Sequence, residues 1–167
     1  FKNFTGIRCN ETFASCGTPG ASYDQIVYSQ RDARFVGGEI EIEHDVAPLW
    51  NGVWGLGAQY DIVHATFADG GYVPKIPPQR LGGSIFYRDE GWNARVSLLH
   101  AFAQTHLGAF ETPTPGFNLL NAELSHTHKF SKAGLPIILT VGLKGENLLN
   151  ADIRLHQSYK KDEVLQP

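Results

Sequence analysis

The chain has 167 residues, and 14 Lys and Arg against 17 Asp and Glu give a formal net charge of −3. This length is enough for one domain with a core, and the lack of a basic surplus argues against nucleic acid as a partner. Eighteen Gly, nine Pro and no Met indicate a β-rich chain with many turns. The longest apolar runs, such as residues 135–139, are far too short for a membrane-spanning helix.

The first distinctive segment is residues 7–22, an irregular stretch that contains Cys9 and Cys16. A structural zinc site needs four ligands, and a redox pair has Cys-x-x-Cys spacing, so neither use fits these two residues. The surrounding Gly and Ser residues favour a short disulfide between them, formed in an oxidising compartment. Two free thiols are the alternative.

A long alternating pattern follows, which predicts one strand over residues 23–46 and a hairpin over residues 37–67. Alternation with a period of two is typical of strands with one apolar and one polar face. Pro48 and the pair Asn51-Gly52 predict the turn between the two arms. The apolar face carries Ile40, Ile42, Trp54, Leu56, Ala58, Tyr60 and Ile62, and the polar face carries Glu39, Glu41, Glu43, Gly55, Gly57, Gln59 and Asp61.

The length of these arms bears on the kind of β-protein. Strands of soluble proteins mostly have about 5–6 residues, whereas a strand that crosses a membrane needs roughly 9–11. Both arms reach the second length. The hairpin by itself leaves two interpretations open: a membrane barrel with lipid outside and water or a plug inside, or a large soluble barrel or sandwich with its apolar faces inward.

Four more strands are predicted downstream, and the connections between strands alternate in length. The strands are expected at residues 81–88, 92–102, 120–129 and 137–146. Short turns are expected at residues 47–52, 89–91 and 131–136, and longer loops at residues 7–22, 68–78, 108–117 and after residue 150. Short periplasmic turns at one rim and long extracellular loops at the other are typical of outer-membrane barrels. Aromatic residues at strand ends fit interfacial girdles: Trp54, Tyr87, Trp92 and Phe130.

Four sequence patterns resemble TonB-dependent outer-membrane receptors. Residues 146–150, ENLLN, match the motif (D/E)NL(L/F)N, and His156, Ser158 and Lys160 or Lys161 match the loop that follows it in the family. Upstream, residues 32–39, DARFVGGE, are similar to a strand of the family, and residues 73–80, VPKIPPQR, to its PRIPPxR segment. The patterns occur in the family's order and span the chain from about residue 23 onward.

This resemblance implies an all-β fold of antiparallel transmembrane β-barrel strands in an up-and-down meander. Because the receptors have 22 strands, we expect residues 1–167 to be a fragment of a larger barrel, its C-terminal portion. The plug domain, the TonB box and the final strand of the family are not found in the sequence. The implied location is the outer membrane of a Gram-negative bacterium.

The resemblance also implies a function, namely TonB-energised uptake of a scarce nutrient such as a siderophore, haem or a metal ion. The expected partners are outer-membrane lipid, TonB through the absent plug domain, and a small-molecule or metal-chelate ligand. No cofactor is expected. The alternative from a different class is a small self-contained or soluble β-barrel that binds an apolar ligand.

Four residues in or beside the long loops are candidates for facing a ligand: Asp69, His106, Glu111 and His156. Simple solvation in a loop is the other interpretation of each. Imidazole and carboxylate groups together suit borderline cations such as zinc, but the sequence does not identify a metal. His126 and His128 share one face of a strand and could chelate, yet that face is the predicted lipid face, so we expect an interfacial role for them.

Catalysis is not expected from this sequence. Ser97 and His100 fall on opposite faces of a strand and cannot act as a nucleophile and its base. Glu39, Glu41 and Glu43 could suggest paired carboxylates, but a ladder of charges facing a polar barrel lumen explains them more simply. His44, His64 and His100 fall on apolar-face positions and are expected to be structural.

Overall fold

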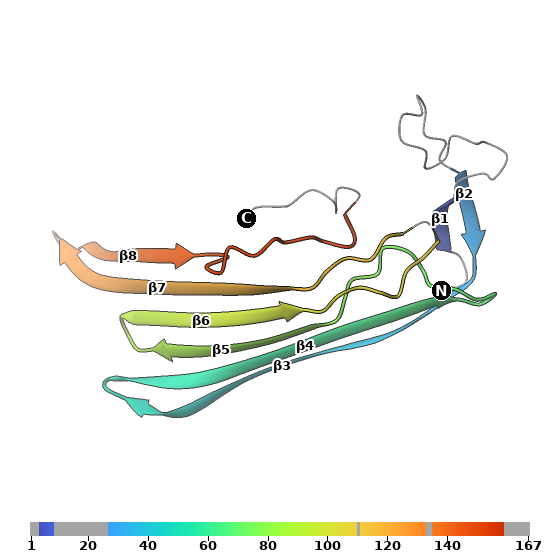
Figure 1. The fold of residues 1–167 in the computed structure, drawn as a ribbon. Coiled ribbons are helices and arrows are strands. Elements are labelled where there is room, and N and C mark those ends of the chain that lie inside the picture. The colour runs from blue at the N-terminus through green and yellow to red at the C-terminus, as the bar shows by residue number, and fades with distance from the viewer. Residues whose placement is uncertain (1–3, 9–26, 110, 133–134, 159–167) are drawn as a thin grey trace.

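A computed structural model describes residues 4–8, 27–109, 111–132 and 135–158. Within these residues the fold is all-β, with eight strands in two antiparallel sheets (Figure 1). Cys9 and Cys16 lie outside the described residues, so their disulfide stays a prediction. No helix in the described part of the chain has the length and hydropathy needed to span a membrane.

The large sheet has six strands, and each pairs with the next one along the chain. It consists of β3 (Ala33–Leu49), β4 (Gly52–Phe67), β5 (Arg80–Arg88), β6 (Trp92–Ala101), β7 (Phe117–Lys132) and β8 (Leu135–Gly145). This order confirms the predicted antiparallel meander. The sheet is not closed, because β3 and β8 lie at its two edges and do not pair with each other.

The predicted single strand over residues 23–46 is wrong. Its described part divides at Asp32 into β2 (Val27–Arg31), which pairs with β1 (Phe4–Arg8) in a second sheet, and β3, which pairs with β4. The carbonyl of Asp32 accepts a hydrogen bond from Ala68 N at 2.9 Å. Arg31 Nε donates to Asp69 Oδ2 at 3.2 Å. The alternation of apolar and polar residues continues through Asp32. Such alternation indicates which face of a strand a residue occupies, but it does not indicate where the chain changes its pairing partner.

The turn between β3 and β4 is tighter than predicted. β3 continues through a bulge between Asp45 and Ala47 and ends at Leu49, which leaves two residues in the turn. Trp50 has a positive φ of 50°, in a turn that the sequence predicted from Pro48 and the pair Asn51-Gly52. Pro48 directly follows the bulge between Asp45 and Ala47, and a bulge is a place where a strand tolerates proline.

The short turns and the long connections lie at opposite ends of the sheet, as predicted (Figure 1). In the turn after β5, the carboxylate of Asp89 organises the backbone. Its Oδ1 accepts hydrogen bonds from Gly91 N at 2.7 Å and Trp92 N at 2.6 Å, and its Oδ2 accepts one from the Tyr87 hydroxyl at 2.8 Å. The hydrogen bonds from Trp92 N, then Gly91 N and then Tyr87, lower the pKa of Asp89 from its ordinary value of 3.8.

We expect this turn to loosen in acid. Because the folded-state pKa of Asp89 is depressed, its contribution to stability is present above pH 3.8 and is lost as pH falls through the lower folded-state value. In NMR spectra of the folded chain, the amide protons of Gly91 and Trp92 should titrate together with a midpoint below 3.8. The variant Asp89→Asn, which keeps an acceptor that does not titrate, should remove the transition. A midpoint at or above the ordinary value would contradict the assignment.

The two faces of the sheet differ in chemistry along its full width, which confirms the predicted side-chain facing. One row of paired residues crosses five strands on the apolar face: Ile42, Ala58, Gly83, Leu98 and Leu120. The neighbouring row on the other face is polar or small: Glu43, Gly57, Ser84, Ser97 and Asn121. Large apolar side chains stay exposed, with Leu98 at 46% and Leu143 at 76%. The hydrophobic cluster of buried residues is small: Ala33, Ala65 and Val73.

Candidate functional site

Ion pairs connect neighbouring strands across the polar face. Arg95 of β6 donates from Nη2 to Glu43 of β3 at 2.5 Å and from Nη1 to Ser84 Oγ of β5 at 3.2 Å. Arg88 Nη2 donates to Asp45 Oδ1 at 2.6 Å. These side chains are partly exposed, so each pair contributes at most about 1 kcal/mol in water. These ion pairs make this face polar, and they add little to the stability of the sheet.

A phenylalanine lies among these charges on the polar face. Phe86 is 3% exposed, and a side chain at Gly55 on the adjacent strand would collide with its ring, since a Cβ there would stand 2.3 Å from Phe86 Cζ. The guanidinium groups of Arg88 and Arg95 each lie 5.0 Å from the ring centroid. Glycine at position 55 therefore makes room for a ring that two cations cover. Phe86 was not predicted from the sequence to have a special role.

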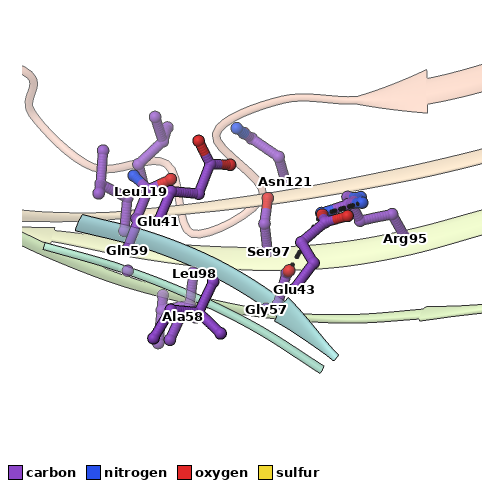
Figure 2. A pocket seen from close by; sticks show the side chains of 15 residues that line it. Glu41, Glu43, Gly57, Ala58, Gln59, Arg95, Ser97, Leu98, Leu119 and Asn121 are labelled. Atoms are coloured by element: carbon purple, nitrogen blue, oxygen red, sulfur yellow. Dashed lines mark hydrogen bonds and ion pairs between the residues drawn. The ribbon is translucent and has the colours of Figure 1, made fainter. Parts of the chain in front are cut away.

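A hollow of about 310 Å³ lies on the polar face between β3 and β7. Its polar lining includes Glu41, Glu43, Gln59, Arg95, Ser97 and Asn121. Figure 2 shows Arg95 reaching toward Glu43, with Ser97 and Asn121 nearby. Carboxylates, a guanidinium, amides and a hydroxyl together form a wetted surface suited to hydrogen-bonding solutes. The predicted charge ladder is thus present as a face that carries both signs of charge.

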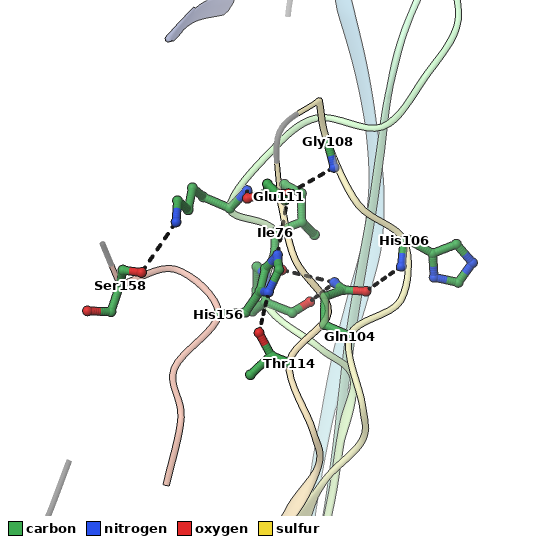
Figure 3. Close-up of polar contacts among 10 residues, drawn as sticks. Ile76, Gln104, His106, Gly108, Glu111, Thr114, His156 and Ser158 are labelled. Atoms are coloured by element: carbon green, nitrogen blue, oxygen red, sulfur yellow. Dashed lines mark hydrogen bonds and ion pairs between the residues drawn. The ribbon is translucent and has the colours of Figure 1, made fainter. Parts of the chain in front are cut away.

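A second group of polar residues joins three long connections at the other end of the sheet: residues 68–79, 102–116 and 146–158 (Figure 3). Glu111 is its centre. Glu111 Oε1 accepts a hydrogen bond from Lys75 N at 2.8 Å, and Oε2 accepts one from Gly108 N at 2.8 Å. One carboxylate therefore ties together two loops that are far apart in the sequence.

His156 brings the third connection to Glu111. The imidazole is fully buried, with Nδ1 2.7 Å from Thr114 Oγ1 and Nε2 3.4 Å from Glu111 Oε2. Lys75 Nζ also donates to the carbonyl of Ser158 at 3.3 Å. The segment after β8 is therefore held against the other two loops at two points.

Gln104 also belongs to this network, in which it links residues 68–79 to residues 102–116. Its Nε2 donates to the carbonyl of Ile76 at 2.9 Å, and its Oε1 accepts from His106 N at 3.0 Å. Its backbone exchanges hydrogen bonds with Thr114. Sequence reasoning missed Gln104, Thr114 and Lys75, because isolated polar residues in loops carry no periodic or motif signal.

The four ligand-facing candidates do not form one site. Glu111 and His156 are in contact with each other, but inside the loop network. Asp69 lies at the end of β4 and is paired with Arg31. His106 is exposed, and Figure 3 shows its ring pointing away from the network. Ligand contact remains a prediction for all four, while the structure gives Glu111 and His156 a role in holding the loops together.

The histidines of β7 lie on the apolar face near the short turns, as the sequence predicted. Ring centroids are 4.4 Å apart for Trp92 and His126, 6.3 Å for His126 and His128, and 5.8 Å for His128 and Phe130. The four rings form a row that starts on β6 at Trp92 and continues along β7. No set of three or more His, Cys, Asp or Glu within the described ranges is arranged to hold a metal ion.

Compared with known proteins, the chain matches no family model and no curated sequence. The likeness to TonB-dependent receptors therefore depends on the four sequence patterns alone.

Proposed function

We propose that this chain forms part of the wall of a transmembrane β-barrel in the outer membrane of a Gram-negative bacterium, and that the barrel is a TonB-dependent receptor. The observation that carries the proposal is the continuous apolar face of the six-stranded sheet, which lies opposite a face rich in charged and polar side chains. Such a sheet suits lipid on one side and water on the other.

The physical case concerns the exposed apolar side chains. Soluble monomers rarely expose a contiguous apolar patch larger than a few hundred Å². Here large apolar residues are exposed on every strand from β3 to β8, including Ile42, Leu56, Ile85, Leu98, Leu124 and Val141. In a bilayer these side chains contact lipid instead of water, so their exposure carries no unfavourable free energy of hydration. A strand in hydrocarbon must have its backbone N–H and C=O groups hydrogen-bonded within the protein. Pairing between successive strands provides these hydrogen bonds inside the sheet.

The open edges favour a barrel larger than the described sheet. Unpaired backbone groups of β3 and β8 would be costly in hydrocarbon, so further strands must pair with them there. A self-contained small barrel would need these edges to pair with each other, and within the described residues they do not. The 22-strand barrel of the resembled family meets this requirement.

In the proposed orientation, the short turns face the periplasm and the long connections face the outside. The hollow lined by Glu43 and Arg95 then faces the lumen, and the loop network around Glu111 lies at the outer mouth. The nutrient would be a siderophore, haem or a metal ion. It would cross the membrane chemically unchanged, and TonB would supply the energy through a plug domain.

Two adjacent leucines provide a matched test. Leu98 lies on the apolar face and Leu99 on the polar face, where its register partners are Gly82 and Leu119. We expect brominated lipid to quench the fluorescence of Leu98→Trp but not that of Leu99→Trp. Both substitutions are made in a background in which Trp50, Trp54 and Trp92 are Phe, with the chain refolded into vesicles.

Circular dichroism first establishes that both variants keep the β-structure of the parent chain. Equal quenching of the two reporters would contradict the facing. A β-structured chain that stays outside the vesicles, with neither reporter quenched, would favour the soluble alternative.

A further inference from the structure

Three aromatic rings meet on the surface beside the loop network. His64 comes from β4, Tyr72 from residues 68–79 and His106 from residues 102–116. The ring centroids are 5.5 Å apart for His64 and His106, 5.6 Å for His64 and Tyr72, and 4.9 Å for Tyr72 and His106. All three residues are exposed. Within the described part of the chain, no hydrogen bond uses a ring nitrogen of either histidine.

The two imidazoles meet edge to face at an interplanar angle of 84°, and their centroids are about as far apart as those of two rings that share one metal ion. Two imidazoles bound at tetrahedral angles, with metal–nitrogen distances of 2.0–2.1 Å, have ring centroids about 5 Å apart. We propose that His64 and His106 form a two-imidazole site for a borderline divalent cation such as Zn²⁺, Ni²⁺ or Cu²⁺. Because the described residues supply no third His, Cys, Asp or Glu, water completes the coordination.

The ligand type decides which cations fit. Imidazole suits Zn²⁺, Ni²⁺ and Cu²⁺, whereas Mg²⁺ and Ca²⁺ prefer oxygen ligands. Tyr72 packs edge-on against both rings and limits their movement, which lowers the entropic cost of bringing the two nitrogens to one ion. Both rings are exposed, and His64 lies three residues beyond Asp61, the last residue of β4 that pairs with β5, so a hydrated cation can reach the two rings from the loop end of the sheet.

The other imidazole–carboxylate pair is less suited to a metal ion. Each carboxylate oxygen of Glu111 already accepts a backbone hydrogen bond, and His156 Nδ1 lies 2.7 Å from Thr114 Oγ1. A cation there would have to displace these bonds inside a fully buried site. The proposed site therefore uses His106, one of the four ligand-facing candidates, together with His64, which was expected from the sequence to be structural.

The test is Cu²⁺ and Zn²⁺ binding by the detergent-solubilised chain, measured by calorimetry. Cys9→Ser and Cys16→Ser are included so that thiolates cannot bind the metal. We expect one equivalent of either ion to bind and Mg²⁺ not to bind. His64→Phe or His106→Phe, each of which keeps a ring for packing, should weaken binding about a hundredfold because the second ligand of a chelate is lost.

The matched control is His128→Phe, which removes another exposed imidazole stacked on a ring and should leave affinity unchanged. Electron paramagnetic resonance of the Cu²⁺ complex should show two imidazole nitrogens, a result that needs no variant to fold. A spectrum with one imidazole, or affinity that His64→Phe and His106→Phe leave unchanged, would overturn the proposal. The site does not depend on the membrane assignment, since it is measured in detergent and its loss would leave the lipid quenching unaffected.

Discussion

Lysine at position 98 should destabilise the sheet in a bilayer by about 2–4 kcal/mol, whereas lysine at position 97 should cost little. Leu98 lies on the apolar face between Gly83 and Leu120, so Leu98→Lys would place an ammonium group in hydrocarbon. Ser97 lies on the polar face beside Asn121, and it lines the hollow that contains Glu41 and Glu43. Ser97→Lys would therefore meet water and carboxylates.

The free energy of unfolding can be measured by urea titration of the chain in lipid vesicles, with tryptophan emission as the signal. The two lysine variants differ by one position and carry the same added charge, so each is the control for the other. Equal destabilisation would reject the proposed facing. The same comparison in detergent-free buffer should not give a folded chain if lipid covers the apolar face.

Glu111→Ala should loosen the contacts between the three long connections. The substitution leaves the backbone N–H groups of Lys75 and Gly108 without their acceptor, at about 1–3 kcal/mol for each buried donor. It also removes the carboxylate that faces His156 Nε2. Amide hydrogen exchange of the detergent-solubilised chain should therefore show reduced protection at Lys75 and Gly108, with the strands β5 and β6 unaffected.

Glu111→Gln gives a sharper version of the same experiment. One amide oxygen remains as an acceptor, but the NH₂ group faces the second donor, so only one of the two amides should keep its protection. Glu90→Ala, which removes an exposed carboxylate in a short turn, is the control and should change neither amide. Unchanged protection at both amides in Glu111→Ala would show that the carboxylate does not hold the loops.

The sequence alone determined the strands from β4 to β8, the two faces of the large sheet and the ends at which its strands turn. Alternation is a local property with a period of two, so the position of Leu98 or Ser97 in the pattern assigns each to a face without knowledge of any partner. Short turns also leave a local signal, as Asp89 and the glycine after Glu90 show. The antiparallel meander follows from these features, because strands that are consecutive in the sequence tend to lie side by side, and the short turns join three of the five neighbouring pairs directly.

The tertiary structure decided which distant residues meet. The change of partner at Asp32, the contact of Glu111 with Lys75 and His156, and the approach of His64 to His106 each join segments that are far apart along the chain. Loop residues have no periodicity that predicts where their side chains lie. Their positions follow from the ends of the strands that carry them, because those strands bring the long connections to one end of the sheet, where buried backbone donors must find acceptors.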